Sequence, residues 1–477
     1  MTPELTTELL RAAAVGAAFL AIFGLAELWR GFGPPPEWTR KFVHVAGGLV
    51  AASLPWVLDH HWTVLGLGLA LGGLLWWTRR MGWLQSVHGV ERTTEGGLHF
   101  PLAIYLLFLL AAHEPVFYLV SVLVLVVADT AAAILGSAYG RATYEVEEDR
   151  RSLEGSTVFF LMAFLSIHLP LLLLTELDRG AVVLISVQLA LLVTFFEAIS
   201  VRGIDNLVVP LGTLYLLVKL TPQDAAAIGA QLAAQLVIIA VIALVAWRFR
   251  FLRMSGALAL MLFMYGAWSL GGPAWVVAPV VAMLAFAGFR GWLQDTAAAP
   301  DARYQVLALF HVAIVAGLLF IANNTFRTLV QVPERWAALG DGDPFYPLYV
   351  GAVAAHLALL GWVLMDRAAL AGWKRRRLVG GAFVGTLLVV VPAGILAGVL
   401  LPGAEGARGA QVWIHAGVGS VIPLVSVALF AGFRRWLGMG PHGTGAPGLQ
   451  VLRAQTASVG MATLLVLGVH FWRLGLL

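Results

Sequence analysis

The chain has 477 residues, of which 60% are hydrophobic and 12% are charged, and it contains no cysteine. Soluble domains carry roughly twice this charged fraction, so the composition excludes an ordinary soluble domain, and the lack of cysteine excludes disulfides, zinc–thiolate sites and thiol nucleophiles. The formal charge of +4 does not indicate nucleic-acid binding, because basic residues in a membrane protein mostly mark the side on which a loop lies.

Apolar runs of about 20 residues, the length that crosses a bilayer, recur along the whole chain. They predict an all-α, polytopic integral membrane protein with about sixteen transmembrane segments. The segments are expected near residues 8–29, 41–59, 61–78, 98–112, 115–137, 156–175, 180–200, 205–219, 225–247, 254–271, 273–289, 304–322, 345–365, 378–401, 410–433 and 455–472. Basic residues are concentrated in every second loop, so the positive-inside rule predicts that these loops are cytoplasmic and both termini are outside. The expected location is a plasma or inner membrane of prokaryotic type.

The second predicted segment begins with a short basic run that contains Arg40 and Lys41, and His44 follows one helical turn after Arg40. Residues four apart share one face of a helix, so Arg40 and His44 are expected to point the same way. The simpler interpretation is a basic anchor at the membrane interface. His99 and Pro101 open the fourth segment, and His99 is interpreted as an interfacial residue.

Asp129 is set inside an apolar segment, about eight residues or roughly 12 Å from its predicted cytoplasmic end. A lone carboxylate at such a depth is unfavourable unless it is paired or binds a metal. Gly136 and Gly140 follow on one helix face, where they serve either close helix packing or clearance for a nucleotide.

A polar loop with Arg141 leads to the run Arg150-Arg151-Ser152-Leu153-Glu154-Gly155-Ser156, which starts the next segment. Ser152 or Ser156 would cap this helix, and Glu154 would favour its positive end. The functional alternative, compatible with the first, is a helix N-terminus and guanidinium groups that face phosphates.

Two further acidic residues are predicted at the same membrane side. Glu197 lies near the cytoplasmic end of its segment, Asp205-Asn206 opens the next one, and Pro210 is tolerated in the first turn. Asp205 could simply cap its helix. Asp129, Glu197 and Asp205 together offer the hard oxygen ligands that Mg²⁺ prefers beside substrate phosphates.

With these pieces in order, the first 220 residues resemble the polyprenol kinase family, which includes dolichol kinase and phytol (farnesol) kinase. The matching motifs are Arg40-Lys41-x-x-His44, Phe100-Pro101, Asp129-x-x-Ala132-x-x-x-Gly136-x-x-x-Gly140, Ser152-Leu153-Glu154-Gly155-Ser156 and Glu197-x-x-Ser200-x-x-Gly203-x-Asp205-Asn206-x-x-x-Pro210. The family usually has lysine where this chain has Arg151, which keeps the charge but changes its reach and geometry.

The resemblance implies phosphoryl transfer, usually from CTP with Mg²⁺, to the hydroxyl of an isoprenoid alcohol. It implies catalytic roles for Asp129, Arg151, Glu154, Glu197 and Asp205. The implied nucleotide-binding residues are Gly136, Gly140, Arg141, Arg150, Arg151, Ser152, Gly155, Ser156 and Asn206. Arg40, Lys41, His44 and Pro210 are assigned to the substrate side. The expected partners are the alcohol, the nucleotide and membrane lipid, with no nucleic acid, and the sequence leaves a homodimer open.

A composition change near residues 221–224 predicts a boundary between a catalytic domain, 1–222, and a second membrane domain, 223–477, which is rich in Leu, Val, Ala and Gly. Residues 255–259 and 271–275 faintly resemble the opening of the phytyl-phosphate kinase family. The acidic metal motif of that family is missing, and the corresponding region has His356. This half is interpreted as a degenerate relative or an unrelated scaffold without a second kinase activity.

Two alternative functions stay open for the whole chain. Phosphatidate cytidylyltransferases also combine glycine-spaced acidic helices with a basic Ser-x-x-Glu-Gly loop, but they release pyrophosphate instead of a nucleoside diphosphate. A transporter or flippase would use buried carboxylates to carry ions, and it would not turn over nucleotide. Clustering of the polar groups on one membrane side, and not at the midplane, argues against transport.

Overall fold

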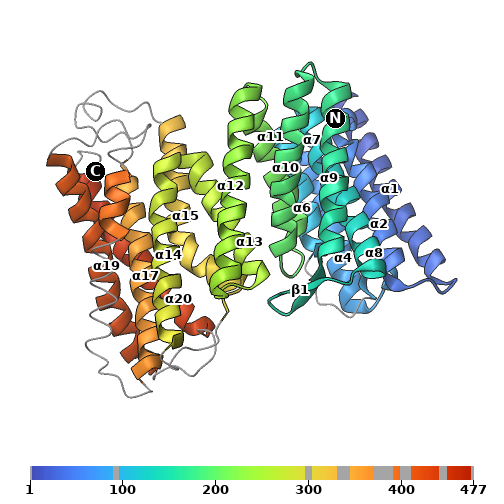
Figure 1. Ribbon diagram of the computed structural model, residues 1–477. Coiled ribbons are helices and arrows are strands. Elements are labelled where there is room, and N and C mark those ends of the chain that lie inside the picture. Colours follow the sequence, from blue (N-terminus) through green and yellow to red (C-terminus); the bar gives the residue numbers. More distant parts are fainter. Residues whose placement is uncertain are drawn as a thin grey trace. The chain divides into compact units, whose positions relative to one another are not determined.

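The computed structural model describes residues 3–89, 96–295, 303–329, 344–369, 390–397, 410–439 and 448–473 (Figure 1). Over these residues the protein is all-α apart from one short β-hairpin and a single bridge between Leu252 and Tyr304. The chain forms two compact units, Met1–Ala233 and Ala234–Leu477. The division falls within helix α12 (Ala225–Phe249), which begins just after the predicted boundary at 222/223.

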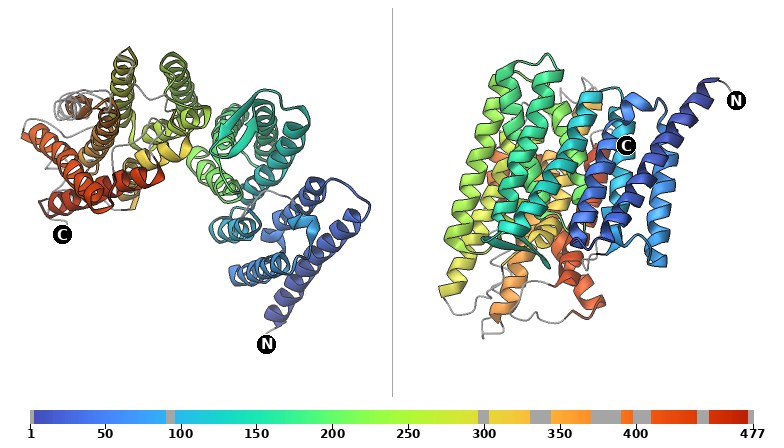
Figure 2. Two further views of the ribbon diagram at one scale, coloured as in Figure 1. Left: turned by 90° about the horizontal axis from the view of Figure 1, so that it is seen from below. Right: turned by 90° about the vertical axis from the view of Figure 1, so that its right-hand side faces the viewer.

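Unit 1 is a helical bundle whose long helices run side by side (Figure 2). Its helices are α1 (Pro3–Arg30), α2 (Pro36–Ala52), α3 (Leu54–Val57), α4 (His61–Met81), α5 (Gln85–His88), α6 (Gly96–Ala111), α7 (Pro115–Leu123), the π-helical turn η1 (Val124–Ala128), α8 (Asp129–Tyr139), α9 (Leu153–Leu174), α10 (Arg179–Ile199) and α11 (Asp205–Leu220). Strands β1 (Thr143–Val146) and β2 (Asp149–Ser152) form an antiparallel hairpin between α8 and α9, with Thr143 opposite Ser152.

Unit 2 is built from longer apolar helices. They are the remainder of α12, α13 (Met254–Gly271), α14 (Pro273–Asp295), α15 (Val306–Leu329), α17 (Tyr346–Ala369), α19 (Ala410–Trp436) and α20 (Leu449–Arg473). Helix α17 carries much of the core of this unit, where Tyr349 is fully buried and donates a 2.7 Å hydrogen bond to the carbonyl of Trp275.

Eleven helices in the described residues are long and apolar enough to cross a membrane, which confirms a polytopic membrane protein but not the predicted count of sixteen. Four of the remaining predicted segments, 41–59, 61–78, 98–112 and 205–219, are helical in unit 1. Helices α2, α6 and α11 have only 16 or 17 residues, fewer than a straight crossing needs, and α4 is long enough but is not among the eleven. The fifth, 378–401, lies outside the described residues except for 390–397.

In the core of unit 1, a buried tyrosine connects helix α7 to helix α2. Tyr118 on α7 is fully buried and donates a 2.9 Å hydrogen bond to the carbonyl of Ala51 on α2. On the outside, large apolar side chains such as Leu10 and Leu173 are well exposed, as expected for helices that face lipid. The hairpin lies at one end of these helices (Figure 1).

Candidate functional site

A cavity of about 610 Å³ lies beside the hairpin of unit 1, within the size range of small-molecule sites. Helices α2, α8, α9, α10 and α11, both strands and the links after α8 and α10 contribute to its lining. The predicted residues that line it are Arg40, Lys41, His44, Asp129, Gly136, Gly140, Arg141, Arg150, Arg151, Ser152, Gly155, Ser156, Glu197, Asp205 and Asn206. Motifs far apart in the sequence therefore meet in one place.

Asp129 is paired with a lysine. The Lys41 ammonium donates a 2.5 Å hydrogen bond to Asp129 Oδ2, and the Lys41 side chain is only 5% exposed. His44 Nε2 lies 3.5 Å from the same oxygen and 3.3 Å from the carbonyl oxygen of Leu125. Of the two interpretations of an intramembrane carboxylate, pairing is the one seen here, and the cation comes from the basic run that was assigned to the substrate.

The direction in which the Asp129 side chain points depends on the π-helical turn η1, which ends at Ala128 directly before it. A π-turn carries one more residue than an α-turn, and such turns occur frequently at functional sites. Helices α7, η1 and α8 form one continuous rod over Pro115–Tyr139. The π-turn therefore sets the side of the rod from which the Asp129 side chain projects. No pattern in the sequence pointed to the π-turn.

Arg151 joins the hairpin to the end of α10. Its guanidinium forms an ion pair with Glu197 and donates a 2.8 Å hydrogen bond to the carbonyl of Ser200. Both side chains of the pair are mostly buried, and Arg151 Nε has no hydrogen-bond partner. A second cation–carboxylate pair thus lines the same cavity.

The other hairpin contacts hold polar side chains in fixed positions. Arg150 donates from Nε and Nη2 to the hydroxyl of Thr143 at 3.0 and 2.7 Å. The hydroxyls of Tyr144 and Ser156 lie 2.9 Å apart. Burial raises the pKa of Tyr144 above its ordinary value, so its hydroxyl stays protonated and can donate.

Helices α8 and α9 meet at a seam of small residues. A Cβ on Gly136 would lie 3.0 Å from the Cα of Gly155, and one on Gly140 would lie 2.7 Å from the hydroxyl of Ser152. Ser152 is the N-cap of α9 and accepts a 3.1 Å hydrogen bond from the Gly155 amide. Both glycines therefore serve close packing and line the cavity, but only Gly136 lies on α8, because Gly140 is its C-cap in an extended conformation.

Asp205 is the first residue of α11, whose N-cap is Ile204, and Asp205 Oδ1 is buried with no hydrogen-bond partner. The loop before it contains Gly203, whose φ is +82°, a conformation that favours glycine. His99 Nδ1 lies 3.0 Å from the Gly203 carbonyl oxygen. His99 thus has a structural contact that positions the loop beside the cavity.

Comparison with known proteins adds a relative for part of the chain. No family model and no solved structure matches this chain. Phytol kinase from Synechocystis sp. is 32% identical over 181 residues, which cover 38% of this chain and 77% of the relative. The chain belongs to the polyprenol kinase family.

Two residues assigned from the polyprenol kinase resemblance do not line the cavity. The Glu154 carboxylate accepts hydrogen bonds of 3.0 and 3.3 Å from the amide of Ala142, so it fastens the hairpin to α9. Pro210 is buried within α11. The catalytic assignment of Glu154 and the substrate assignment of Pro210 gain no support from their positions.

Several polar lining residues were not assigned from the sequence. They are Glu37, Ser137, Thr143, Asp149 and Arg202. The Glu37 carboxylate forms a 2.5 Å ion pair with the Arg40 guanidinium. Oppositely charged residues three apart on a helix often pair, so the sequence spacing could have predicted this contact. Thr143 and Asp149 reach the cavity through strand pairing, which no local pattern indicated.

The carboxylates of the cavity are compatible with a metal that arrives with phosphates. Within the described residues, no three His, Asp or Glu side chains form a ready metal cluster. Asp129 and Glu197 are each paired with a cation, whereas Asp205 keeps a buried oxygen without a partner. Mg²⁺ commonly binds to one or two carboxylates together with substrate phosphates, and this donor set fits that mode.

Proposed function

We propose that the protein is an integral membrane kinase that transfers the γ-phosphate of CTP to the hydroxyl of an isoprenoid alcohol such as phytol, farnesol or geranylgeraniol. The observation that carries the proposal is the single cavity in which Asp129, Arg151 and Asp205 meet. The relationship to a phytol kinase supports the alcohol as acceptor, and the family resemblance supports CTP as donor.

The cations of the cavity suit a triphosphate. Arg141 and Arg150 lie on the hairpin side of the lining, beside the N-terminus of α9. Guanidinium groups and free helix amides are the usual phosphate ligands of proteins. In the proposed mechanism these groups bind and orient the triphosphate, and Arg151 stabilises the charge on the transferring phosphoryl group.

The two ion pairs would exchange partners when phosphates enter. Lys41 and Arg151 can turn from Asp129 and Glu197 to phosphate oxygens, which leaves the two carboxylates available. The alcohol oxygen then forms a bond to the γ-phosphorus as the bond to the β-phosphate bridging oxygen breaks, Asp129 accepts the hydroxyl proton, and CDP leaves. When bound, Mg²⁺ would neutralise phosphate charge, with Asp205, Glu197 and Asp129 as its candidate ligands.

The cavity is proposed to face the cytoplasm, where nucleoside triphosphates are present. The loops that carry Arg141, Arg150, Arg151 and Arg202 belong to the basic side of the sequence, which the positive-inside rule assigns to the cytoplasm.

The deciding experiment incubates the purified full-length protein with γ-labelled CTP or ATP and a panel of phytol, farnesol, geranylgeraniol and longer polyprenols. We expect labelled alcohol phosphate and CDP, with CTP preferred. Release of pyrophosphate would instead identify a cytidylyltransferase. Absence of any nucleotide turnover with the alcohols would contradict the kinase, and absence of turnover also with phosphatidate added would contradict the cytidylyltransferase.

A further inference from the structure

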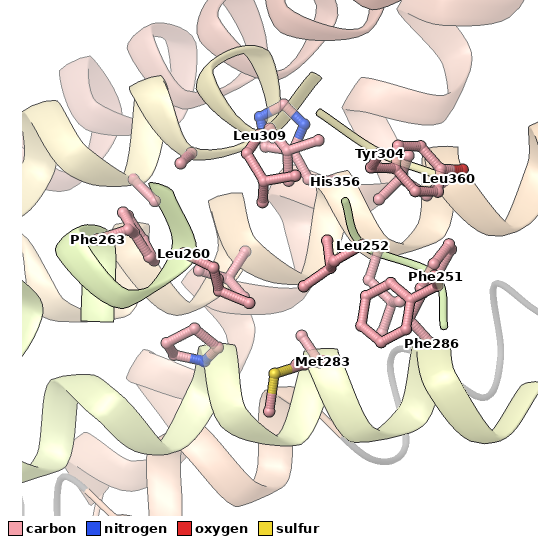
Figure 3. A pocket seen from close by; sticks show the side chains of 17 residues that line it. Phe251, Leu252, Leu260, Phe263, Met283, Phe286, Tyr304, Leu309, His356 and Leu360 are labelled. Carbon is pink, nitrogen blue, oxygen red and sulfur yellow. The ribbon is translucent and has the colours of Figure 1, made fainter. Parts of the chain in front are cut away.

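Unit 2 contains a cavity of its own, with a volume of about 110 Å³, between α13, α14, α15 and α17 (Figure 3). Nearly all described residues that line it are apolar, and Phe251, Phe263, Met283 and Phe286 are typical of them. The cavity is not fully enclosed. It shares none of its lining residues with the cavity of unit 1.

Two side chains in this described lining, Tyr304 and His356, carry polar groups, and His356 is the one that apolar packing does not explain. His356 on α17 is 2% exposed, and neither of its ring nitrogens has a hydrogen-bond partner. Figure 3 shows the imidazole among the side chains around the cavity. Buried polar groups are nearly always hydrogen-bonded. A trapped water would need two to four polar partners, and besides the imidazole the only polar side chain in the described lining is Tyr304. An amphiphilic ligand with one polar end would satisfy both the ring and the apolar walls.

We propose that the cavity of unit 2 is a second binding site for an isoprenoid alcohol, in which His356 is hydrogen-bonded to the hydroxyl. This inference rests on the proposed function, which makes such an alcohol the substrate of unit 1. The cavity, at about 110 Å³, is smaller than the apolar void of ~150 Å³ that takes up benzene, so it holds the hydroxyl and at most one isoprene unit. The rest of the hydrocarbon chain leaves through the open side of the cavity.

The lining also determines which form of the lipid binds. None of the described lining residues is Lys, Arg, Asp or Glu. Transfer of an ionised phosphate into such surroundings without a cation is far less favourable than transfer of a hydroxyl that finds a hydrogen-bond partner. The site therefore selects the alcohol and rejects its phosphate ester. Unit 2 would hold substrate near the enzyme without retaining product.

Photolabelling tests this directly in the full-length protein without nucleotide. The probe is a phytol analogue with a diazirine near the hydroxyl end, and labelled peptides are identified by mass spectrometry. We expect labels in the segments around Phe251–Phe286 and Val353–Leu360. Unlabelled phytol should compete, and phytyl phosphate should compete at least tenfold more weakly. Absence of label from these segments, or equal competition by the phosphate, would overturn the inference.

Two histidine variants form a matched pair for the same experiment. His356→Phe keeps a ring but removes its hydrogen bonding, so labelling of unit 2 should fall at least tenfold. His311→Phe changes a histidine on α15 that bonds to Thr456 and does not line the cavity, so labelling should persist. Unchanged labelling in His356→Phe would refute the role of the imidazole. Thermal unfolding of both variants checks their folding, and Ala316→Leu, which narrows the cavity, should lower labelling independently.

Failure of this inference can be told apart from failure of the proposed function. Photolabelling needs no turnover, so label in unit 2 together with no phosphoryl transfer would support the second site and reject the kinase. Phosphoryl transfer to phytol without label in unit 2 would support the kinase and reject the second site.

Discussion

At the scale of single residues, the site is governed by two buried cation–carboxylate pairs, Lys41–Asp129 and Arg151–Glu197. Removing one partner of a buried pair leaves an uncompensated charge, whereas removing both can be nearly neutral for stability. This difference allows the structural role of each pair to be separated from its role in catalysis. Replacing the second partner as well should restore stability, but it cannot restore turnover.

We expect Asp129→Asn to lower turnover by at least about 100-fold and to lower stability, since Lys41 loses its counter-charge. The double variant Lys41→Met/Asp129→Asn should recover stability but stay inactive. Turnover with CTP and phytol, and thermal unfolding, measure the two effects. Near-normal turnover in Asp129→Asn would remove Asp129 from the mechanism.

Arg151 bonds to two groups at once, Glu197 and the Ser200 carbonyl. Arg151→Lys keeps one charge but not the planar fork, so we expect about a tenfold loss of kcat/KM, the equivalent of about 1.4 kcal/mol. Arg151→Ala should lose at least ten times more. Measuring all three proteins with CTP and ATP shows whether residue 151 also sets the phosphate donor. If both variants kept full activity, Arg151 would be a topology signal only, and if both were equally inactive, the planar guanidinium itself would be required.

At the scale of elements, the seam between α8 and α9 brings the Asp129 helix and the Ser152 N-cap together. A Cβ at Gly136 would press on the backbone of Gly155 at 3.0 Å, and overpacking of this kind destabilises by about 1–3 kcal/mol. Gly136→Ala should therefore lower the unfolding temperature. Gly72→Ala on α4, where a Cβ meets nothing within 4 Å, is the matched control and should be neutral or stabilising. Equal unfolding temperatures of the two variants would contradict close packing of α8 against α9 at Gly136.

The sequence allowed the membrane class and the set of motifs around the site to be predicted, because composition and ordered spacing are local properties. It did not indicate which cation meets which carboxylate. Lys41 and Asp129 are 88 positions apart, and their pairing depends on how α2 packs beside η1 and α8. The sequence indicated only a polar loop at the place of the hairpin, because strands β1 and β2 contain mostly polar and charged residues and few apolar ones. The count of sixteen segments is not confirmed, because helices α2, α6 and α11 have only 16 or 17 residues and the segment 378–401 lies mostly outside the described residues.

At the scale of the whole molecule, access to the cavity depends on membrane orientation. Arg141 and Arg179 are exposed and lie on either side of α9, so single cysteines there should react with an impermeant thiol reagent from opposite sides of the membrane. The chain has no cysteine of its own, which keeps the background low. Arg141→Cys should label from the cytoplasmic side. Labelling of both positions from one side would contradict the proposed orientation.

The π-turn before Asp129 has a consequence for how this site tolerates insertions and deletions. Each residue of an α-helix advances the direction of the next by about 100°, and η1 holds one residue more than a regular turn would. Deleting one residue within Val124–Ala128 would convert the turn to regular α-helix, and because the wider turn already absorbs the extra residue, the direction of the Asp129 side chain would change little. Deleting one residue from the α-helical part of α7 would instead rotate everything after it by about 100°. Asp129 would then leave Lys41 and His44 while the rod itself stays helical. Circular dichroism should change little in either deletion variant, whereas turnover should be lost only in the α7 variant. The rod can thus lose a residue at the π-turn without losing the position of its carboxylate.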